Sequence, residues 1–374
     1  MEDLAGRQDG LEIPQEFDIN PTARGFTMRG WDFSRAQIAR AVRDRVLLNP
    51  AFELGTNSCP WNCDFCFSED PKHPTKRRLV GEMSLRDRLR LVDQAADLGA
   101  LTINWVGAGE PTIDPDFWTI LERIVSRGIV PIVYTEGTLR LSRPKFSKRL
   151  FDLGATVVLK VNSLADHAYQ NRIVAGSAQT KTAAADYSVR RNRVIDLLLE
   201  LGFADSTPTR LAFDTIITKQ NLKEVTDIHR YARVNNIFVM FVNYLPAGRS
   251  VDGREDAISR QQTLDVFDQI ERIDRQEFGF THRTDFPYAG GVPCTIRGLG
   301  LFTKITGEVF DCPGQLMSLG NLKTQSLESI WERARAITKS FDGKCLPRQL
   351  AWERQARSAL KDPHVVKRIL ESYG

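Results

Sequence analysis

Three cysteines lie within eight residues of one another, in the stretch Cys59-Pro-Trp-Asn-Cys63-Asp-Phe-Cys66. Thiolates this close in sequence can converge on one inorganic centre. Zinc accepts three thiolates and an imidazole in a tetrahedron, and His73 follows seven residues after Cys66, so a zinc site is one interpretation. An iron–sulfur cluster and a disulfide framework are two others, and the octapeptide alone leaves all three open.

The six cysteines of the 374-residue chain form two triplets, the one above and a second made of Cys294, Cys312 and Cys345. Six are few for a disulfide scaffold of this length, and grouped cysteines in a reducing compartment more often bind metal. The polar residues 1–10 lack the apolar stretch of a secretory signal, and no segment is apolar for long enough to span a bilayer. We therefore expect a cytoplasmic protein with no membrane partner.

The overall composition is that of an ordinary soluble protein, with 42% hydrophobic and 26% charged residues and a net charge of +4. A nucleic-acid-binding protein usually carries a clustered basic face, and this charge is too small to indicate one. The compact basic cluster Lys76-Arg77-Arg78 is interpreted as a solvated loop. We expect no nucleic-acid partner.

The elements that must position the cysteines begin at residue 51, where strand-like and helix-like segments alternate. Apolar runs predict strands at 51–55, 101–106, 129–134, 156–161, 211–217 and 237–243, and helical spacing predicts helices between them. The polar segment 166–185 is expected to be irregular. Alternating strands and helices indicate a parallel α/β sheet, and six units indicate an incomplete barrel, a partial (β/α)6 TIM-like barrel over residues 49–250.

Four further regions flank this barrel. Residues 1–48 are expected to be an N-terminal extension with a helix over 34–47, and 251–290 a linker with a helix over 261–275. A small C-terminal domain is expected over 291–346, with strands 300–305 and 308–311 forming a β-hairpin around Thr306-Gly307 and a helix over 327–340. A helical tail over 347–374 completes the chain.

Two motifs follow the first two predicted strands, where a parallel β/α array binds its ligands. The cysteines follow the first strand, and Val106-Gly107-Ala108-Gly109-Glu110-Pro111 follows the second. Gly107 and Gly109 would let backbone polar groups approach a ligand without a Cβ in the way, and Glu110 offers an acceptor for an ammonium group.

Together the motifs resemble the radical SAM superfamily over about residues 51–345. The Cys-x3-Cys-x2-Cys spacing with Phe65 before the last cysteine resembles its signature, and the second motif resembles its Gly-Gly-Glu-Pro segment, with Ala108 replacing a glycine. The resemblance implies that Cys59, Cys63 and Cys66 bind a [4Fe-4S] cluster whose fourth iron is free for a ligand. It implies contacts with S-adenosylmethionine at Phe65, Gly107, Gly109, Glu110, Pro111, Lys160, Asn162 and Ser163.

Other predicted strand ends offer weaker candidates, for which a capping or surface-loop role is an equal alternative. Tyr134-Thr135-Glu136-Gly137 resembles a Thr-Asn-Gly segment of the family, with Glu136 in place of asparagine. Arg249 lies in a Pro-x-Gly-Arg segment. Lys160 lies within the apolar run Val-Val-Leu-Lys-Val, and a lysine there needs an anionic partner.

The family's chemistry implies a mechanism. An electron, supplied by a donor such as flavodoxin or ferredoxin, reaches the cluster and cleaves S-adenosylmethionine, and the resulting 5'-deoxyadenosyl radical takes a hydrogen atom from the substrate. Thiolate ligation and burial favour the low potential that this requires.

The second cysteine triplet resembles the opening of the SPASM and Twitch domains, which hold auxiliary iron–sulfur clusters. The spacing from Cys294 through Gly307 to Cys312 carries this resemblance, and the small number of cysteines favours the shorter Twitch type with one auxiliary cluster. Three cysteines leave this cluster one ligand short, so either another side chain completes it or the open iron binds substrate. Purely structural thiols are the third interpretation.

The predicted function is therefore a radical SAM enzyme that oxidises its substrate or forms a bond in it. The substrate is expected to be a natural-product intermediate such as a sugar or aminocyclitol, with a ribosomally synthesised peptide as the alternative. A zinc-stabilised binding protein using Cys59, Cys63, Cys66 and His73 is the rival of another class. Tyr134, Glu136 and Tyr244 lie near predicted strand ends, but the sequence assigns no catalytic acid, base or radical quencher.

Overall fold

The structure is a computed structural model that describes residues 25–68, 78–175, 184–245, 247–250, 254–282, 284, 287–288, 290–337 and 343–345. Several expectations from the sequence lie outside these residues. They concern residues 1–24 of the N-terminal extension, His73, the basic residues Lys76 and Arg77, and the C-terminal tail 347–374.

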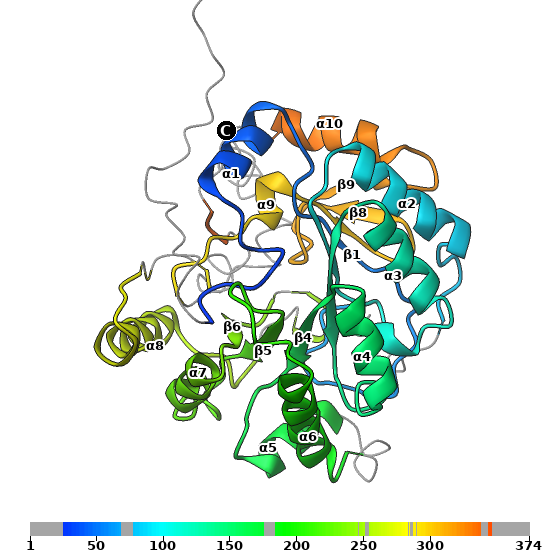
Figure 1. Cartoon of the computed structure of the whole chain (residues 1–374). Helices are drawn as coiled ribbons and strands as arrows, with labels where there is room; N and C mark the ends of the chain where they lie inside the picture. Colours follow the sequence, from blue (N-terminus) through cyan, green and yellow to red (C-terminus); the bar gives the residue numbers. More distant parts are fainter. Residues whose placement is uncertain are drawn as a thin grey trace, which may run out of the picture.

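Six parallel strands form the centre of the molecule (Figure 1). They lie side by side in the order in which they occur in the sequence, and each neighbouring pair is parallel. This arrangement confirms the predicted six-unit partial barrel. The strands are β1 (Ala51–Phe52), β2 (Thr102–Trp105), β3 (Val130–Thr135), β4 (Thr156–Lys160), β5 (Leu211–Ile216) and β6 (Phe238–Val242).

Amphipathic helices cover the outer face of the sheet and bury its outward-pointing side chains, such as Val133 and Leu159 (Figure 1). Ser34, Ser84 and Ser259 each begin a helix with a capping box, in which side chains bond the first free N–H groups. The α-helices are α1 (Arg35–Arg43), α2 (Leu85–Asp97), α3 (Phe117–Ser126), α4 (Pro144–Asp152), α5 (His167–Ala175), α6 (Tyr187–Glu200), α7 (Val225–Val234), α8 (Arg260–Ile273), α9 (Ile296–Leu299) and α10 (Leu327–Ile337). Shorter helical segments are η1 (Pro111–Ile113), η2 (Gly248–Ser250) and the π-helical η3 (Asp274–Phe278).

Helix α5 corrects the expectation that 166–185 is irregular. Its weak amphipathic pattern hid it, because polar residues separate the few apolar ones. Tyr169, Ile173 and Val174 nevertheless lie on one side and pack against Trp61 and Tyr187, so tertiary packing stabilises this short helix.

The segment before α1 fills the inner face of the partial barrel, opposite the helices. Phe26, Met28 and Trp31 are buried against inward-pointing side chains of β3, β4, β5 and β6. Met28 forms a parallel bridge with Thr209, and Trp31 Nε1 donates to Asn104 Oδ1 at 2.9 Å. The described part of the N-terminal extension is therefore packed into the barrel, and Trp31 reaches the cavity at the carboxyl ends of the strands.

The C-terminal region adds three short strands, β7 (Phe302–Thr303), β8 (Glu308–Phe310) and β9 (Ser318–Asn321). Strands β7 and β8 form the predicted antiparallel hairpin, while β9 was not predicted. Strand β7 pairs in parallel with β1, so all nine strands form one continuous sheet. The domain boundaries expected at 48, 250, 290 and 346 stay predictions.

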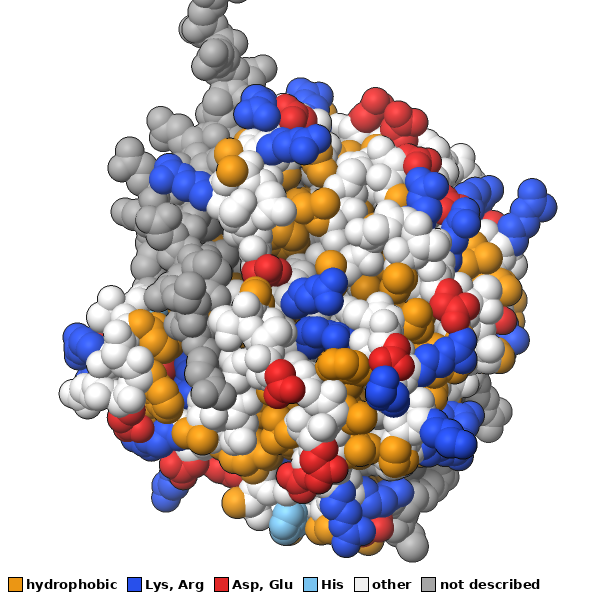
Figure 2. All heavy atoms as spheres, in the orientation of Figure 1, with side chains coloured by type: hydrophobic (Ala, Val, Ile, Leu, Met, Phe, Trp, Pro, Cys, Tyr) orange, Lys and Arg blue, Asp and Glu red, His pale blue; other side chains and the backbone are white. Residues whose placement is uncertain are grey.

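Among the described residues, every helix is too short or too polar to cross a membrane. On the face that Figure 2 shows, Lys and Arg side chains are interspersed with Asp and Glu side chains. This face therefore carries mixed charge.

Candidate functional site

A cavity of about 280 Å³ opens at the carboxyl ends of the parallel strands. Both cysteine triplets line it, although the sequence separates them widely. Its walls also contain much of the predicted cofactor site. The predicted residues that line it are Cys59, Cys63, Phe65, Cys66, Gly109, Glu110, Lys160, Cys294, Cys312 and Cys345.

Four predicted cofactor contacts, Gly107, Pro111, Asn162 and Ser163, are not among the lining residues. Asn162 and Ser163 are each only 1% exposed, and the structure uses both in the turn between β4 and α5. Their backbone N–H groups donate to Gln170 Oε1 at 2.8 and 3.0 Å. Asn162 and Ser163 therefore support the turn after β4 and do not form the surface of the cavity.

The first triplet lies on the loop of residues 59–66, called the cysteine loop below. Its three cysteines are half-buried, and the six described cysteines form no disulfide. A zinc ion would draw three sulfurs onto one atom at about 2.3 Å. Across the described residues, no three His, Cys, Asp or Glu side chains are grouped in that way. A [4Fe-4S] cluster binds each thiolate to a different iron, and the three half-buried cysteines of this loop could hold three of its four irons.

The second triplet lies across the cavity. Cys294 and Cys312 are buried, Cys345 is half-buried, and the backbone N–H of Cys294 donates to Gly343 O at 2.8 Å. Burial raises the pKa of the Cys294 and Cys312 thiols. Binding iron at these thiols would therefore displace protons. A donor set of three sulfurs facing one apolar cavity suits an iron–sulfur cluster.

The loop of Gly109 and Glu110 packs directly on residues 56–58, which lead into the cysteine loop. The backbone N–H groups of Gly109 and Glu110 donate to Thr56 O and Ser58 O at 3.0 and 2.9 Å. A Cβ on Gly109 would lie 2.0 Å from Ser58 O, so only glycine allows the two loops this contact. Gly109 also lines the cavity, so its predicted approach to a ligand stays a prediction beside this contact with Ser58.

Glu110 is 4% exposed and already accepts several hydrogen bonds. Its Oε1 accepts from Thr112 and Thr135 Oγ1 at 2.7 Å each, and its Oε2 accepts from the backbone N–H of Glu136 at 2.9 Å. Burial raises the pKa of Glu110. An ammonium group at this carboxylate would offset that burial, so the arrangement is compatible with the predicted role of Glu110.

Glu136 is a second buried carboxyl group beside Glu110. Burial, followed by the charge of Glu110, raises its pKa to about 7. Its own oxygens accept from Thr138 Oγ1 at 2.6 Å and from the backbone N–H of Leu139 at 2.7 Å. The cavity wall therefore holds one acid that titrates near neutral pH.

Lys160 has the anionic partner that its apolar strand requires. Its Nζ lies 3.0 Å from Asp214 Oδ2 and 4.4 Å from the centre of the Phe65 ring. Lys160 and Asp214 are register partners across β4 and β5, and Asp214 and Met240 are partners across β5 and β6. These residues form one inward-facing layer at the cavity, and the ion pair places a carboxylate within apolar walls.

Asp214 is a site residue that we did not predict. Its side chain is 22% exposed, and it lines the cavity. The signal was present, because Asp214 interrupts the apolar run Leu-Ala-Phe-Asp-Thr-Ile as Lys160 interrupts its own strand. Trp31 and Tyr288 also line the cavity, although neither belongs to a motif that the sequence predicted.

Tyr134 and Tyr288 also line the cavity, near Cys294 of the second triplet. Burial raises the pKa of both phenols, with further contributions from Asp214 and Cys294 on Tyr134 and from Cys294 on Tyr288. Both tyrosines therefore stay protonated near neutral pH and offer hydrogen-bond donors to the cavity.

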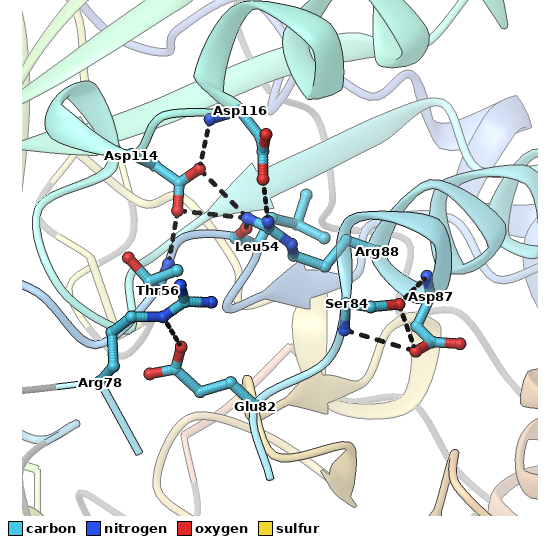
Figure 3. A network of polar contacts seen from close by, with 9 residues as sticks. All are labelled: Leu54, Thr56, Arg78, Glu82, Ser84, Asp87, Arg88, Asp114 and Asp116. Carbon is cyan, nitrogen blue, oxygen red and sulfur yellow. Dashed lines mark hydrogen bonds and ion pairs between the residues drawn. The ribbon is translucent and has the colours of Figure 1, made fainter. Parts of the chain in front are cut away.

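A buried network fixes the residues just before the cysteine loop (Figure 3). Arg88 of α2 is 2% exposed, and its Nη1 donates to Leu54 O at 2.9 Å and to both oxygens of Asp114 at 3.2 Å. Arg88 also pairs with Asp116. Asp114 Oδ2 accepts from the backbone N–H of Thr56 at 2.7 Å. Helix α2, the end of β1 and the loop after β2 are thereby joined behind the cavity.

Comparison with known proteins gives the same assignment as the sequence motifs. The radical SAM superfamily model matches residues 54–259. Mycofactocin maturase MftC of Mycobacterium ulcerans is 22% identical, over 75% of this chain and 73% of the relative. The AdoMet-dependent heme synthase of Methanosarcina barkeri is also 22% identical, over 79% of this chain and 86% of the relative.

Solved structures show the same fold. SuiB of Streptococcus suis bound to S-adenosylmethionine is similar with a TM-score of 0.59 at 15% identity, over 88% of this chain and 78% of SuiB. Native anSMEcpe with bound AdoMet is similar with a TM-score of 0.55 at 13% identity, over 84% of this chain and 87% of that one.

The matched residues 54–259 span more than half of the chain and contain the cysteine loop, Glu110 and strands β2 to β6. Proteins similar to this chain are named as maturases, a cyclase and a synthase, all of which are enzymes. The interpretation as a zinc-stabilised binding protein is therefore set aside. The chain belongs to the radical SAM superfamily of enzymes, which use a [4Fe-4S] cluster and S-adenosylmethionine.

Proposed function

We propose that this enzyme oxidises, or forms a bond in, a side chain of a ribosomally synthesised peptide held between the two cysteine triplets. The observation that carries the proposal is the shared cavity, which Cys59, Cys63 and Cys66 line together with Cys294, Cys312 and Cys345. A substrate in this cavity would lie between a radical-generating cluster and an auxiliary cluster.

The cavity walls favour a peptide side chain over the sugar or aminocyclitol that we expected from the sequence. Aromatic and aliphatic side chains such as Trp61, Phe67 and Tyr244 make up most of the lining, and Lys160 with Asp214 supply an ion pair. A polyol would leave many hydroxyl groups without partners against such walls, which is costly.

Structural neighbours support the same choice. SuiB bound to the precursor peptide SuiA is similar to this chain with a TM-score of 0.58 at 17% identity. The structure of anSMEcpe with the Kp18Cys peptide is similar with a TM-score of 0.52 at 12% identity. Both neighbours were solved with a bound peptide, and their fold alone carries over to this chain.

In this superfamily the cluster and S-adenosylmethionine supply a 5'-deoxyadenosyl radical that takes a hydrogen atom from a substrate carbon, and an auxiliary cluster would take up the next electron. Cys59, Cys63 and Cys66 would hold the first cluster, and Cys294, Cys312 and Cys345 the second. Glu110 would accept hydrogen bonds from the cofactor's ammonium group, and Phe65 would pack on its adenine. Asp214 would accept, at a carboxylate oxygen, the proton that leaves the substrate with the electron. Flavodoxin or ferredoxin would supply the initial electron.

The test uses the anaerobically reconstituted enzyme with reductant, S-adenosylmethionine and a candidate precursor peptide encoded beside its gene. We expect loss of two hydrogen atoms from the peptide by mass spectrometry, or an intramolecular crosslink with the same mass change. With a peptide deuterated at the reacting carbon, deuterium should appear in 5'-deoxyadenosine. Turnover of an aminocyclitol or sugar with no change in any such peptide would overturn the peptide assignment.

A further inference from the structure

The cysteine loop is held by protein contacts on two opposite sides. On one side, the backbone N–H groups of Asn62 and Asp64 donate to Val174 O and Ile173 O at 3.2 and 3.0 Å. These carbonyls lie at the C-terminal end of α5, where helix carbonyls lack partners within the helix. The helix therefore satisfies its own last carbonyls by binding the loop.

On the other side, two arginines that follow β6 bind the carbonyls of the same loop. Arg249 Nη1 donates to Asn62 O at 2.6 Å and to Cys63 O at 3.1 Å, and its backbone N–H donates to Cys66 O at 3.0 Å. Arg249 also bonds the side chain of Asn62. A planar guanidinium with several fixed donors is suited to gather neighbouring carbonyls in this way.

Arg254 repeats the arrangement one residue along the loop. Its Nη1 donates to Asp64 O at 2.5 Å, and its Nη2 lies 3.0 Å from Asp64 Oδ2. The Arg254 side chain is 21% exposed and that of Asp64 is 30% exposed, so water screens this pair only in part. Asp256 Oδ1 accepts from Arg254 Nε at 3.3 Å and orients it.

The backbone of Gly248, next to Arg249, lies in close contact with the end of the cysteine loop. Gly248 has a φ of +55°, and a Cβ there would lie 2.2 Å from Cys66 O and 2.7 Å from Phe67 C. Glycine at this position is therefore required for the Arg249 backbone N–H to reach Cys66 O. Because Tyr244 and Leu245 line the cavity, the segment that binds the loop continues directly from a cavity wall.

We propose that Arg249 and Arg254 are positioning residues that keep the cysteine loop in its cluster-binding conformation, and that Arg249 also makes the bound cluster easier to reduce. Both arginines bind carbonyl groups of the loop. Asp64 and Asp256 offset the charge of Arg254, so Arg249 is the cation that would act on a cluster of net negative charge. Reduction adds one more negative charge, which nearby positive charge stabilises, and hydrogen bonds and charge around such clusters set their potentials. The proposal rests on the assignment of the cluster to Cys59, Cys63 and Cys66.

The first measurement needs no cluster. Amide hydrogen exchange of residues 59–67 is compared in the iron-free full-length protein and its Arg249→Ala variant. If the arginine keeps the loop in place, the variant should exchange at least about tenfold faster in this loop, because the loop opens more often. Arg272→Ala removes the same charge from an exposed position on α8 and should leave the loop unchanged.

The second measurement is the midpoint potential of the cluster whose electron paramagnetic resonance signal responds to added S-adenosylmethionine. Arg249→Ala should shift it to a more negative value by the equivalent of about a tenfold change in the reduction equilibrium, 59 mV for one electron. Arg249→Lys keeps the charge but loses the fork of donors, so it should restore most of the potential and only part of the loop protection.

Equal loop exchange and equal potential in wild type and Arg249→Ala would overturn the proposal. If Arg249→Ala does not fold, Arg254→Ala tests the loop exchange, and Arg249→Gln, which removes the charge but keeps a hydrogen-bond donor, tests the potential. A protein that shows the predicted exchange difference but modifies no peptide would leave this proposal intact and overturn only the proposed substrate.

Discussion

Glu136 stands where the family's Thr-Asn-Gly segment has an asparagine, and this one difference gives the cavity wall a second acid. Its pKa is raised to about 7 from an ordinary 4.5, first by burial and then by Glu110. Between these two pH values the unfolded chain releases the proton and the folded chain keeps it. The stabilising contribution of Glu136 is therefore complete below about pH 4.5 and is lost as the pH rises to about 7.

We expect Glu136→Gln to remove this loss. Relative to wild type, the unfolding free energy of the variant should rise between pH 5 and pH 7, by at most about 3 kcal/mol. Urea titrations at several pH values measure this difference. Titrating groups other than Glu110, which interacts directly with Glu136, cancel between the two proteins. Parallel pH profiles would show that Glu136 titrates normally in the folded protein.

At the residue scale, the sequence identified groups whose chemistry has a distinctive spacing, and it missed groups whose partner lies in another strand. The cysteines and Glu110 belong to short motifs. The position of Lys160 in an apolar strand predicted an anionic partner. The register between β4 and β5, which places Asp214 opposite Lys160, was needed to identify that partner. A register is fixed by packing of the whole sheet, so it could not be inferred from either strand alone.

The side chain of Arg88 links helix α2 to Leu54, in the segment that leads into the cysteine loop (Figure 3). The side chains of Arg88 and Asp114 are 2% and 1% exposed. Loss of one partner from such a buried pair leaves an uncompensated charge, which typically costs about 3–5 kcal/mol.

We therefore expect Arg88→Met to lower the unfolding free energy by about 3 kcal/mol or more, with a matching fall in thermal midpoint. Arg86→Met is the matched control, since Arg86 lies on the exposed side of the same helix and should change stability by no more than about 0.5 kcal/mol. Both are measured by thermal and chemical denaturation. Equal effects of the two substitutions would mean that the buried network contributes little.

Element prediction succeeded where apolar residues had a clear period and failed where packing alone decides. Strands β2 to β6 are apolar runs covered on both faces, and they were predicted within a residue or two at each end. Helix α5 lacks a clear helical spacing of its apolar residues, and strand β9 has a single large apolar residue, Leu319. Each forms because a neighbour covers it, α5 under Trp61 and β9 beside β8.

At the scale of the whole molecule, the two cysteine triplets meet because the C-terminal strands join the barrel sheet. Strand β7 pairs with β1, the strand that immediately precedes the cysteine loop, and Cys294 and Cys312 lie just before α9 and just after β8. The resemblance to Twitch domains predicted a second site, but it did not predict that both sites share one cavity.

A double variant tests whether the two sites are independent. The reconstituted protein should contain about eight irons per chain if each triplet holds a four-iron cluster. Cys294→Ala combined with Cys312→Ala should remove about half of this iron and leave reductive cleavage of S-adenosylmethionine, while peptide modification is lost. Iron analysis and assay of 5'-deoxyadenosine measure both. Loss of all iron would show that the first cluster depends on the second.

The parallel pairing of β1 with β7 also bears on the electron transfer that the proposed function requires. Adjacent strands lie about 4.8 Å apart, and their hydrogen bonds keep this spacing constant. The cysteine loop follows β1 and Cys312 follows β8, so both would-be cluster sites are attached to one continuous sheet. The sheet would therefore limit how far apart the two clusters can move, while the loops that carry the cysteines set the exact distance between them.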